Sequence, residues 1–172
     1  MKIRFLTLSL ILLVAVSCNK PVDSKINTTQ LTQEVNILLD DWHKAAAEAN
    51  YSNYFTAMDS VSVFVGTDAA EIWSKQQFEN FSKPYFDKGK AWSFTTIDRN
   101  IYIDERGEFV WFDELLDTWM GVCRGSGVVQ KKNSNWKIKH YVLSVTVPND
   151  DVRELIKIKQ EKDSIFLLKY KN

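Results

Sequence analysis

The sequence has few cysteines, few prolines and no excess of charge of either sign. Of its two cysteines, Cys18 lies in a leader-like N-terminal segment, so Cys123 has no partner for an internal disulfide. The three prolines and six glycines form no interior linker, which favours one folded domain. The formal net charge is +0, and removing Lys2 and Arg4 with the leader leaves about −2, a balance that excludes a basic nucleic-acid-binding footprint. Two histidines without an evident third ligand predict neither a metal site nor a cofactor.

The first 18 residues have the pattern of a targeting segment. A positive start is followed by an apolar run over Phe5–Val16 that is too short for a strong membrane span, and small residues precede Cys18. This pattern resembles a bacterial lipoprotein signal, which implies that Cys18 carries lipid. We therefore expect residues 1–18 to be the signal and lipidation site, 19–29 a tether, and 30–172 a folded domain held at the bacterial cell envelope, periplasmic or surface-exposed. An uncleaved anchor or an ordinary signal peptide is the alternative.

Hydrophobic periodicity in the rest of the chain predicts an α+β domain. Apolar residues recur at three- and four-residue steps over 29–50, which predicts an amphipathic helix, and Ser52 can cap a short second helix. Ser74 begins a third helix, which Pro84 either kinks or ends. The remaining expected elements are strands over 61–65, 92–103, 108–118, 122–131 and 136–147, and a charged final helix through about Lys162.

The last three predicted strands are joined by short connections, which predicts an antiparallel meander. With Thr118 paired to Val122 and the next turn closed over two residues, Asp113 faces Gly127 and Gly127 faces His140. At about 4.8 Å between strands, Asp113 and His140 would lie about 10 Å apart, which leaves room for a small ligand. His140 is then a pocket donor or base; the alternative is a core histidine whose hydrogen bonds are satisfied.

Both faces of this predicted meander are apolar, and each also carries polar groups. One face is expected to line a pocket for a small, mostly apolar ligand, through Trp111, Asp113, Gly127 and His140. The opposite face needs cover, since so apolar a surface is rarely left in water, and we expect it to form a homodimer. The residues of this predicted dimer interface are Phe112, Glu114, Leu116, Arg124, Val128 and Leu143, with Glu114 and Arg124 as an ion pair.

Several motifs give the chain a family resemblance. It is similar to the SnoaL-like branch of the nuclear transport factor 2-like (NTF2-like) superfamily over roughly Gln30–Val147, in the segments Trp42–Ala45, Val63–Asp68, Arg124–Gly127 and Trp136–Ile138. The resemblance implies an NTF2-like or cystatin-like roll: a strongly curved, cone-shaped antiparallel sheet wrapped around N-terminal helices, with a cavity open at one end. If the pocket between Asp113 and His140 is wrong, the cavity is organised by Trp42, His43, Asp68 and Trp73.

The resemblance does not fix an activity. The superfamily includes polyketide cyclases, ketosteroid isomerases, dehydratases and epoxide hydrolases, besides binding and dimer-forming domains. The isomerases place a general-base aspartate at the end of the first strand, where this chain has Phe64 and Val65. The expected function is therefore noncatalytic binding of a small, mostly apolar ligand. The alternatives are a hydrolase, isomerase or cyclase that uses Asp113, His140 or His43 as acid or base, and a structural dimerisation module.

Overall fold

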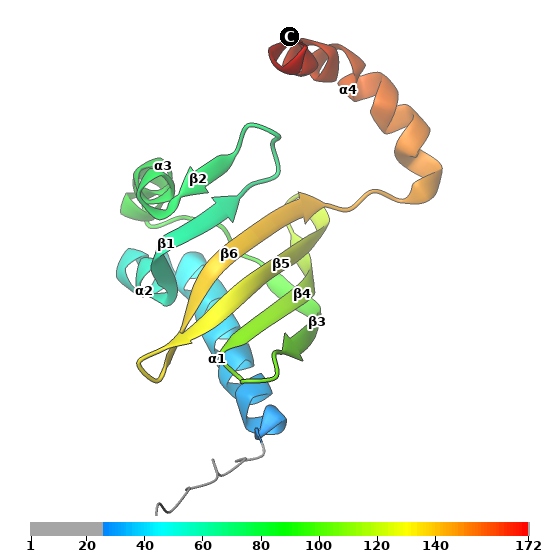
Figure 1. The fold of residues 1–172 in the computed structure, drawn as a ribbon. Coiled ribbons are helices and arrows are strands. Elements are labelled where there is room, and N and C mark those ends of the chain that lie inside the picture. Colours follow the sequence, from blue (N-terminus) through cyan, green and yellow to red (C-terminus); the bar gives the residue numbers. More distant parts are fainter. Residues whose placement is uncertain (1–25, 172) are drawn as a thin grey trace, which may run out of the picture.

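A curved, unclosed sheet of six strands forms the framework of the molecule, in the order β2-β1-β6-β5-β4-β3 (Figure 1). The computed structural model describes residues 26–171. Strand β1 runs parallel to β6, and the other neighbouring strands are antiparallel. The strands are β1 (Met58–Val65), β2 (Ile72–Ser74), β3 (Thr95–Ile103), β4 (Phe109–Thr118), β5 (Gly121–Lys132) and β6 (Asn135–Val145). The predicted α+β class and the curved sheet around N-terminal helices are confirmed.

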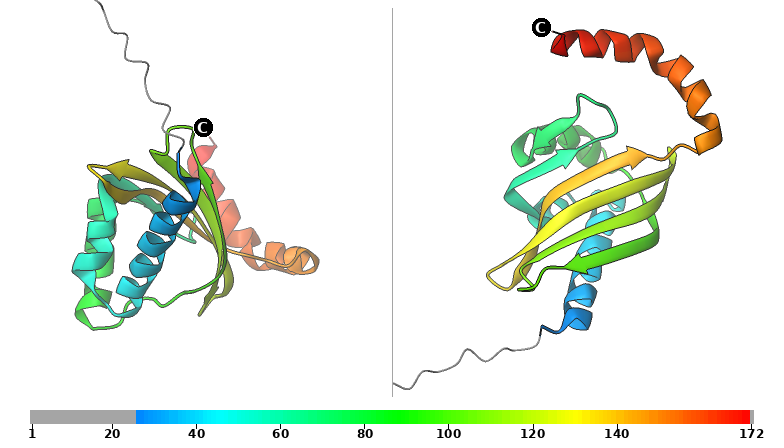
Figure 2. Two further views of the ribbon diagram at one scale, coloured as in Figure 1. Left: turned by 90° about the horizontal axis from the view of Figure 1, so that it is seen from below. Right: turned by 45° about the vertical axis from the view of Figure 1, so that its right-hand side comes forward.

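Three helices cover the concave side of this sheet, which we call the inner face (Figure 2). They are α1 (Thr28–Ala47), α2 (Tyr51–Ala57) and α3 (Lys75–Asp87). Helix α1 presents an apolar stripe, with Val35, Leu39 and Trp42 almost wholly buried, as its sequence period predicts. The convex side, which we call the outer face, is not covered by any of these three helices (Figure 2).

Short local signals set the helix boundaries. Ser74 caps α3, which starts where it was predicted to start, and Gln77 completes a capping box. Pro84 lies inside α3, and the helix continues past it to Asp87. Helix α2 is capped by Asn50 rather than by Ser52. An asparagine side chain accepts the free N–H groups of a first helical turn as well as a serine does, and it stands at the residue where the chain turns.

The C-terminal helix α4 (Val152–Leu167) follows the end of β6 and curves back above the sheet (Figure 1), where Lys162 and Phe166 line a pocket with Val65 of β1 and Val142 of β6. It extends beyond the predicted end at Lys162, and none of its residues is buried. No helix among residues 26–171 combines the length and the apolar character that crossing a membrane requires. The predictions for the leader, including lipidation of Cys18, lie outside the described residues.

The strand register differs from the prediction by one residue between β4 and β5. Thr118 pairs with Gly121, not with Val122, because the turn contains only Trp119 and Met120. Asp113 therefore faces Ser126 rather than Gly127. The prediction assumed a three-residue turn. A two-residue turn in its place shifts every pair of this hairpin by one position.

A second slip of one residue occurs between β5 and β6. The register shifts between the pairs Val129–Ile138 and Val128–His140, so that Lys139 is an extra residue in β6. Gly127 consequently faces Tyr141 rather than His140. The predicted row from Asp113 through Gly127 to His140 is wrong at both steps.

The face that β4 turns towards the helices also differs from the prediction. Phe112, Glu114, Leu116 and Leu143, predicted at a dimer interface, are buried on the inner face with exposed fractions of 2%, 1%, 0% and 6%. The other two residues of that predicted interface, Arg124 and Val128, lie on the outer face, as do three residues of the predicted pocket, Trp111, Asp113 and His140. The apolar face that was expected to need a partner is thus covered by the chain's own helices.

Candidate functional site

Aromatic side chains from four parts of the chain enclose a pocket of about 170 Å³. It lies where β1 ends and the β4–β5 turn begins, and we call it the mouth pocket. Its wall contains Phe64 of β1, Trp73 of β2, Phe78 and Phe81 of α3, and Trp92 and Phe94 of the segment that leads into β3. Such a concave, mostly apolar surface is typical of small-molecule sites.

Ring stacking fixes much of this wall. Phe64 and Phe78 stack with ring centroids 4.0 Å apart and an interplanar angle of 15°. Trp73 lies between α3 residues, with its ring 4.6 Å from that of Phe81 and 5.5 Å from that of Phe78. Offset stacking adds about 0.5–1.5 kcal/mol per pair beyond area burial. The wall is therefore formed before any ligand binds.

The rim of the mouth pocket is more open and more polar. Trp119 and Met120 of the β4–β5 turn lie on one side, and Trp119 is 82% exposed. Thr67 and Glu71 of the β1–β2 connection contribute the polar part. That connection is held by its own hydrogen bonds: Gly66 N–H donates to the Glu71 carbonyl at 2.9 Å, and Asp68 N–H donates to Glu71 Oε2 at 3.2 Å.

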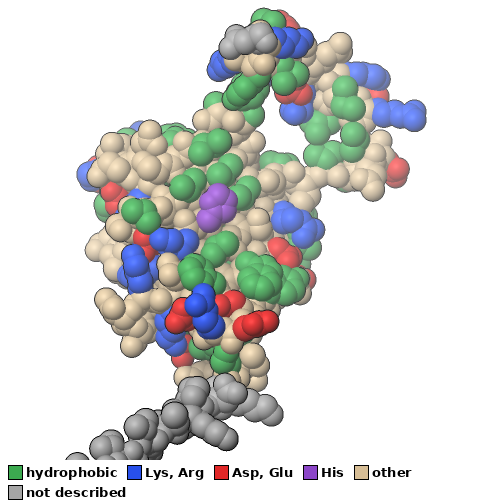
Figure 3. All heavy atoms as spheres, viewed as in Figure 1, with side chains coloured by type: hydrophobic (Ala, Val, Ile, Leu, Met, Phe, Trp, Pro, Cys, Tyr) green, Lys and Arg blue, Asp and Glu red, His purple; other side chains and the backbone are tan. Residues whose placement is uncertain are grey.

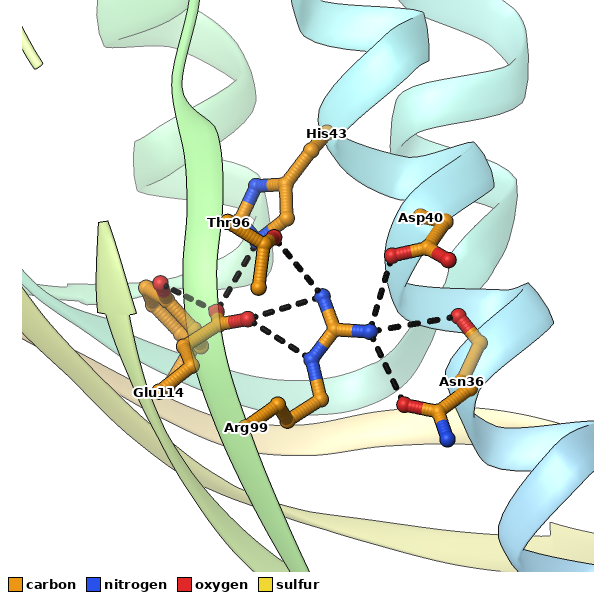
Figure 4. Close-up of polar contacts among 7 residues, drawn as sticks. Asn36, Asp40, His43, Thr96, Arg99 and Glu114 are labelled. Carbon is orange, nitrogen blue, oxygen red and sulfur yellow. Dashed lines mark hydrogen bonds and ion pairs between the residues drawn. The ribbon is translucent and has the colours of Figure 1, made fainter. Parts of the chain in front are cut away.

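A polar network centred on Glu114 lies deeper in the cone (Figure 4). His43 Nε2 lies 2.9 Å from Glu114 Oε1, and the Tyr141 hydroxyl donates to the same oxygen at 2.9 Å. Arg99 donates to Glu114 Oε2 from Nε at 2.9 Å. Arg99 also donates to Asp40 Oδ1 at 2.8 Å, so the guanidinium connects β3 and β4 to helix α1.

The charges of this network stabilise one another. Burial alone would raise the pKa of Glu114, but the hydrogen bond and charge of His43, with the charge of Arg99, lower it overall. Burial, followed by the Glu114 charge, raises the pKa of Tyr141 well above its usual value, so its hydroxyl stays protonated and donates. Because three side chains already bind Glu114, this carboxylate positions its neighbours rather than facing an open site.

His43 also lines a second pocket, of about 290 Å³, with Asp40, Thr95 and Thr96. Phe94 lines both this pocket and the mouth pocket. The ring centroids of His43 and Phe94 are 6.2 Å apart. The Glu114 network and the mouth pocket are thus separated by one aromatic side chain.

The structure brings together some predicted site residues and separates others. Trp73 lines the mouth pocket. Trp42 and His43 are buried, with exposed fractions of 2% and 7%, and do not line the mouth pocket. Asp68 stabilises the adjoining turn by accepting from Ala70 N–H at 2.8 Å. Gly127 lies on the inner face, where an added side chain would collide with the His140 carbonyl and the Phe112 ring.

The other predicted pocket residues lie on the outer face, away from both pockets. Asp113 accepts hydrogen bonds there from Asn100 at 3.3 Å and Tyr102 at 3.2 Å, and lies 3.5 Å from Arg124. Arg124 thus pairs with Asp113, and the predicted Glu114–Arg124 ion pair is wrong. The rings of Tyr102 and Trp111 stack 5.9 Å apart. Figure 3 shows hydrophobic side chains interspersed with charged ones and a histidine on this face.

Sequence reasoning missed much of the mouth pocket, including Phe64, Glu71, Trp92 and Trp119. Two of its tryptophans lie outside the strands, Trp92 in the segment before β3 and Trp119 in the β4–β5 turn. Ends of neighbouring elements meet at one edge of a curved sheet. Among residues 26–171, no three His, Cys, Asp or Glu side chains converge as metal ligands.

Comparison with known proteins agrees with this architecture. Residues 35–148 match the family described as SnoaL-like domain. An NTF2-like protein of unknown function from Pseudomonas putida KT2440 superposes with a TM-score of 0.60 at 12% identity, covering 70% of this chain and 90% of that one. A protein of unknown function with a cystatin-like fold from Nostoc punctiforme gives 0.55 at 13%, covering 67% and 90%. No curated protein matches the sequence significantly.

Proposed function

This chain belongs to the SnoaL-like domain family, and from that premise we propose that it binds a small, mostly apolar ligand in the mouth pocket. The observation that carries the proposal is the mouth pocket itself, which has a volume of about 170 Å³ and a wall of aromatic side chains. Its rings are stacked in advance, so a bound ring or alkyl group would gain contact area without first ordering the site.

Trp119 provides the sharpest test of this site. Its ring is 82% exposed, so Trp119→Ala removes one wall of the pocket at little cost to the folded state. We expect the affinity for 1-naphthol, used as a neutral aromatic probe and measured by isothermal titration calorimetry, to fall by about threefold or more. The matched control is Trp111→Ala on the outer face, where the side chain is 49% exposed. The Trp111→Ala protein should bind 1-naphthol with the same affinity as the unmodified protein.

Two results would refute the binding of a mostly apolar ligand at the mouth pocket. One is the absence of saturable 1-naphthol binding at any accessible concentration. The other is equal weakening by Trp119→Ala and Trp111→Ala, because that pattern describes nonspecific contact with exposed indoles.

The proposal also places the domain at the cell envelope through a lipid on Cys18. Its support is the apolar leader with small residues before the cysteine. Cys18→Ser should abolish incorporation of radiolabelled palmitate in a bacterial host, whereas Cys123→Ser, the control at the other cysteine, should leave the labelling unchanged. Persistent labelling of the Cys18→Ser protein would exclude this anchor.

A further inference from the structure

The mouth pocket contains a carboxylate as well as aromatic rings. Building on the proposed function, we propose that its ligand carries a small organic cation, such as an alkylammonium group, held by Glu71 and the surrounding rings. The charge of the pocket, the type of its rings and its size each support this ligand class.

Glu71 is the charged residue of the mouth pocket. The lining includes no lysine or arginine. None of the ion pairs formed within residues 26–171 includes Glu71. Its Oε2 accepts one backbone hydrogen bond, from Asp68 N–H at 3.2 Å. The Glu71 side chain is half-buried. A neutral apolar ligand that covered it would remove water from the carboxylate and supply no hydrogen bond or charge in exchange, which costs free energy. An anionic ligand would be repelled by the carboxylate. A cation supplies the missing partner.

The rings provide the second part of the recognition. Cations bind over aromatic faces, tryptophan best of all, and the effect grows as water is excluded. Trp73, Trp92 and Trp119 all line the pocket. Trp119 stacks on no other ring of the described chain, in contrast to Trp73 and Trp92. Its ring is therefore available to a bound cation.

The size of the pocket limits the ligand. Sites for drug-sized molecules usually measure about 300–1,000 Å³. The mouth pocket, at about 170 Å³, is smaller and suits a compact group. The combination of a small aromatic cage with one carboxylate is what a substituted ammonium group requires, because it has a spread positive charge and few or no N–H donors.

The test compares two probes that differ in charge but hardly in shape. Choline carries a trimethylammonium group, and 3,3-dimethyl-1-butanol has a neutral tert-butyl group in its place. With the full chain and isothermal titration calorimetry, we expect choline to bind at least about fivefold more tightly. The preference should shrink at high salt, since added ions screen the attraction between charges at the partly exposed rim.

Glu71→Gln should abolish most of this preference, because glutamine keeps an oxygen for Asp68 N–H but loses the charge. The matched control is Glu105→Gln, which neutralises an exposed carboxylate in the β3–β4 turn and should leave the preference intact. The comparison of probes on the unmodified chain needs no variant, so a folding defect of Glu71→Gln would not remove the test.

The outcomes separate this inference from the proposed function. Equal affinities for the two probes, or a preference that survives in Glu71→Gln, would overturn the cationic ligand. If neither probe binds but 1-naphthol does, the inference is wrong and the apolar pocket stands. If 1-naphthol fails and choline binds through Glu71, the inference stands and the mostly apolar ligand is wrong. Failure of all three probes would refute both.

Discussion

The two faces of the central sheet carry similar side chains in neighbouring positions, yet those on the inner face are buried and those on the outer face are accessible to solvent. On the inner face, Glu114 is 1% exposed and is hydrogen-bonded to His43, Arg99 and Tyr141. One residue earlier on the same strand, Asp113 lies on the outer face and forms polar contacts that solvent also reaches. A carboxylate on the inner face therefore depends on its partners, whereas one on the outer face has water as an alternative.

The same contrast applies to the aromatic residues. Phe112 packs in the core and is 2% exposed, while the adjacent Trp111 is 49% exposed. Because the side-chain period of a strand is two residues, the consequences of a substitution should alternate along β4 and β5. The loss of stability should therefore be largest for buried groups on the inner face and smallest for exposed groups on the outer face.

The largest effect is expected for Glu114→Gln. The substitution leaves Arg99 and His43 buried without their carboxylate, and removing one member of a buried ion pair typically costs about 3–5 kcal/mol. Urea denaturation followed by circular dichroism should show this loss in the free energy of unfolding. The control, Asp113→Asn on the outer face, should lose less than about 1 kcal/mol. Equal losses for the two variants would mean that the faces do not differ as described.

A smaller loss is expected for Gly125→Ala. Gly125 faces Glu114 across the sheet, and a Cβ there would press on the Tyr141 hydroxyl and on the Glu114 side chain. Overpacking of this kind typically costs about 1–3 kcal/mol. Ser126→Ala, at the next residue and on the outer face, should change the free energy of unfolding by less than about 0.5 kcal/mol. A stable Gly125→Ala protein would show that the inner face has space that its packing does not indicate.

The sequence was sufficient for most of the elements but not for the faces. Periodicity predicted the helices and every strand except the short β2, and Ser74 predicted the start of α3. The faces of β4 and β5 are both apolar, so the pattern of Trp111, Phe112, Asp113 and Glu114 fits either orientation. A two-residue turn and the extra residue Lys139 then decided the register.

The residues of the mouth pocket could not be grouped into one site from the sequence, for a different physical reason. Its wall combines Phe64, Trp73, Trp92 and Trp119, which are distant in the chain and come together only where the curved sheet opens. Each of them has an ordinary interpretation as a core residue in its own segment. Only Trp73 of this group entered the expected site, and it did so through the family resemblance.

A moderate dependence on pH is expected at the edge of the inner face. The Trp136 indole and Lys131 donate to Glu34 and lower the pKa of that carboxyl from 4.5 to about 2. A lowered carboxyl pKa gives stability that is present above 4.5 and is lost as the pH falls towards 2. Solvent reaches this pair, so the contribution should be about 1 kcal/mol or less.

The matching measurement is urea denaturation at several pH values. Glu34→Gln should be less stable than the unmodified protein at pH 7, and the difference should vanish as the pH approaches 2. A difference that stays constant over this range would show that Glu34 acts through packing rather than through its charge.

The smallest effect on the folded monomer is expected on the outer face, where we predict a homodimer. The surface includes the stacked pair Tyr102 and Trp111 and the exposed side chain of Val122. Trp111→Ala should change the monomer's free energy of unfolding by less than about 1 kcal/mol, because half of the ring is already in water. If two copies associate through this face, the same substitution should weaken association by about thirtyfold or more, since a central tryptophan often supplies at least about 2 kcal/mol.

Light scattering at high micromolar concentration measures the mass of the particle in solution. The control is Trp119→Ala, at an exposed tryptophan outside this surface, which should keep the mass of the unmodified protein. A monomer mass for the unmodified chain would exclude the dimer. A dimer that Trp111→Ala leaves intact would place the contact elsewhere and leave the outer face to solvent.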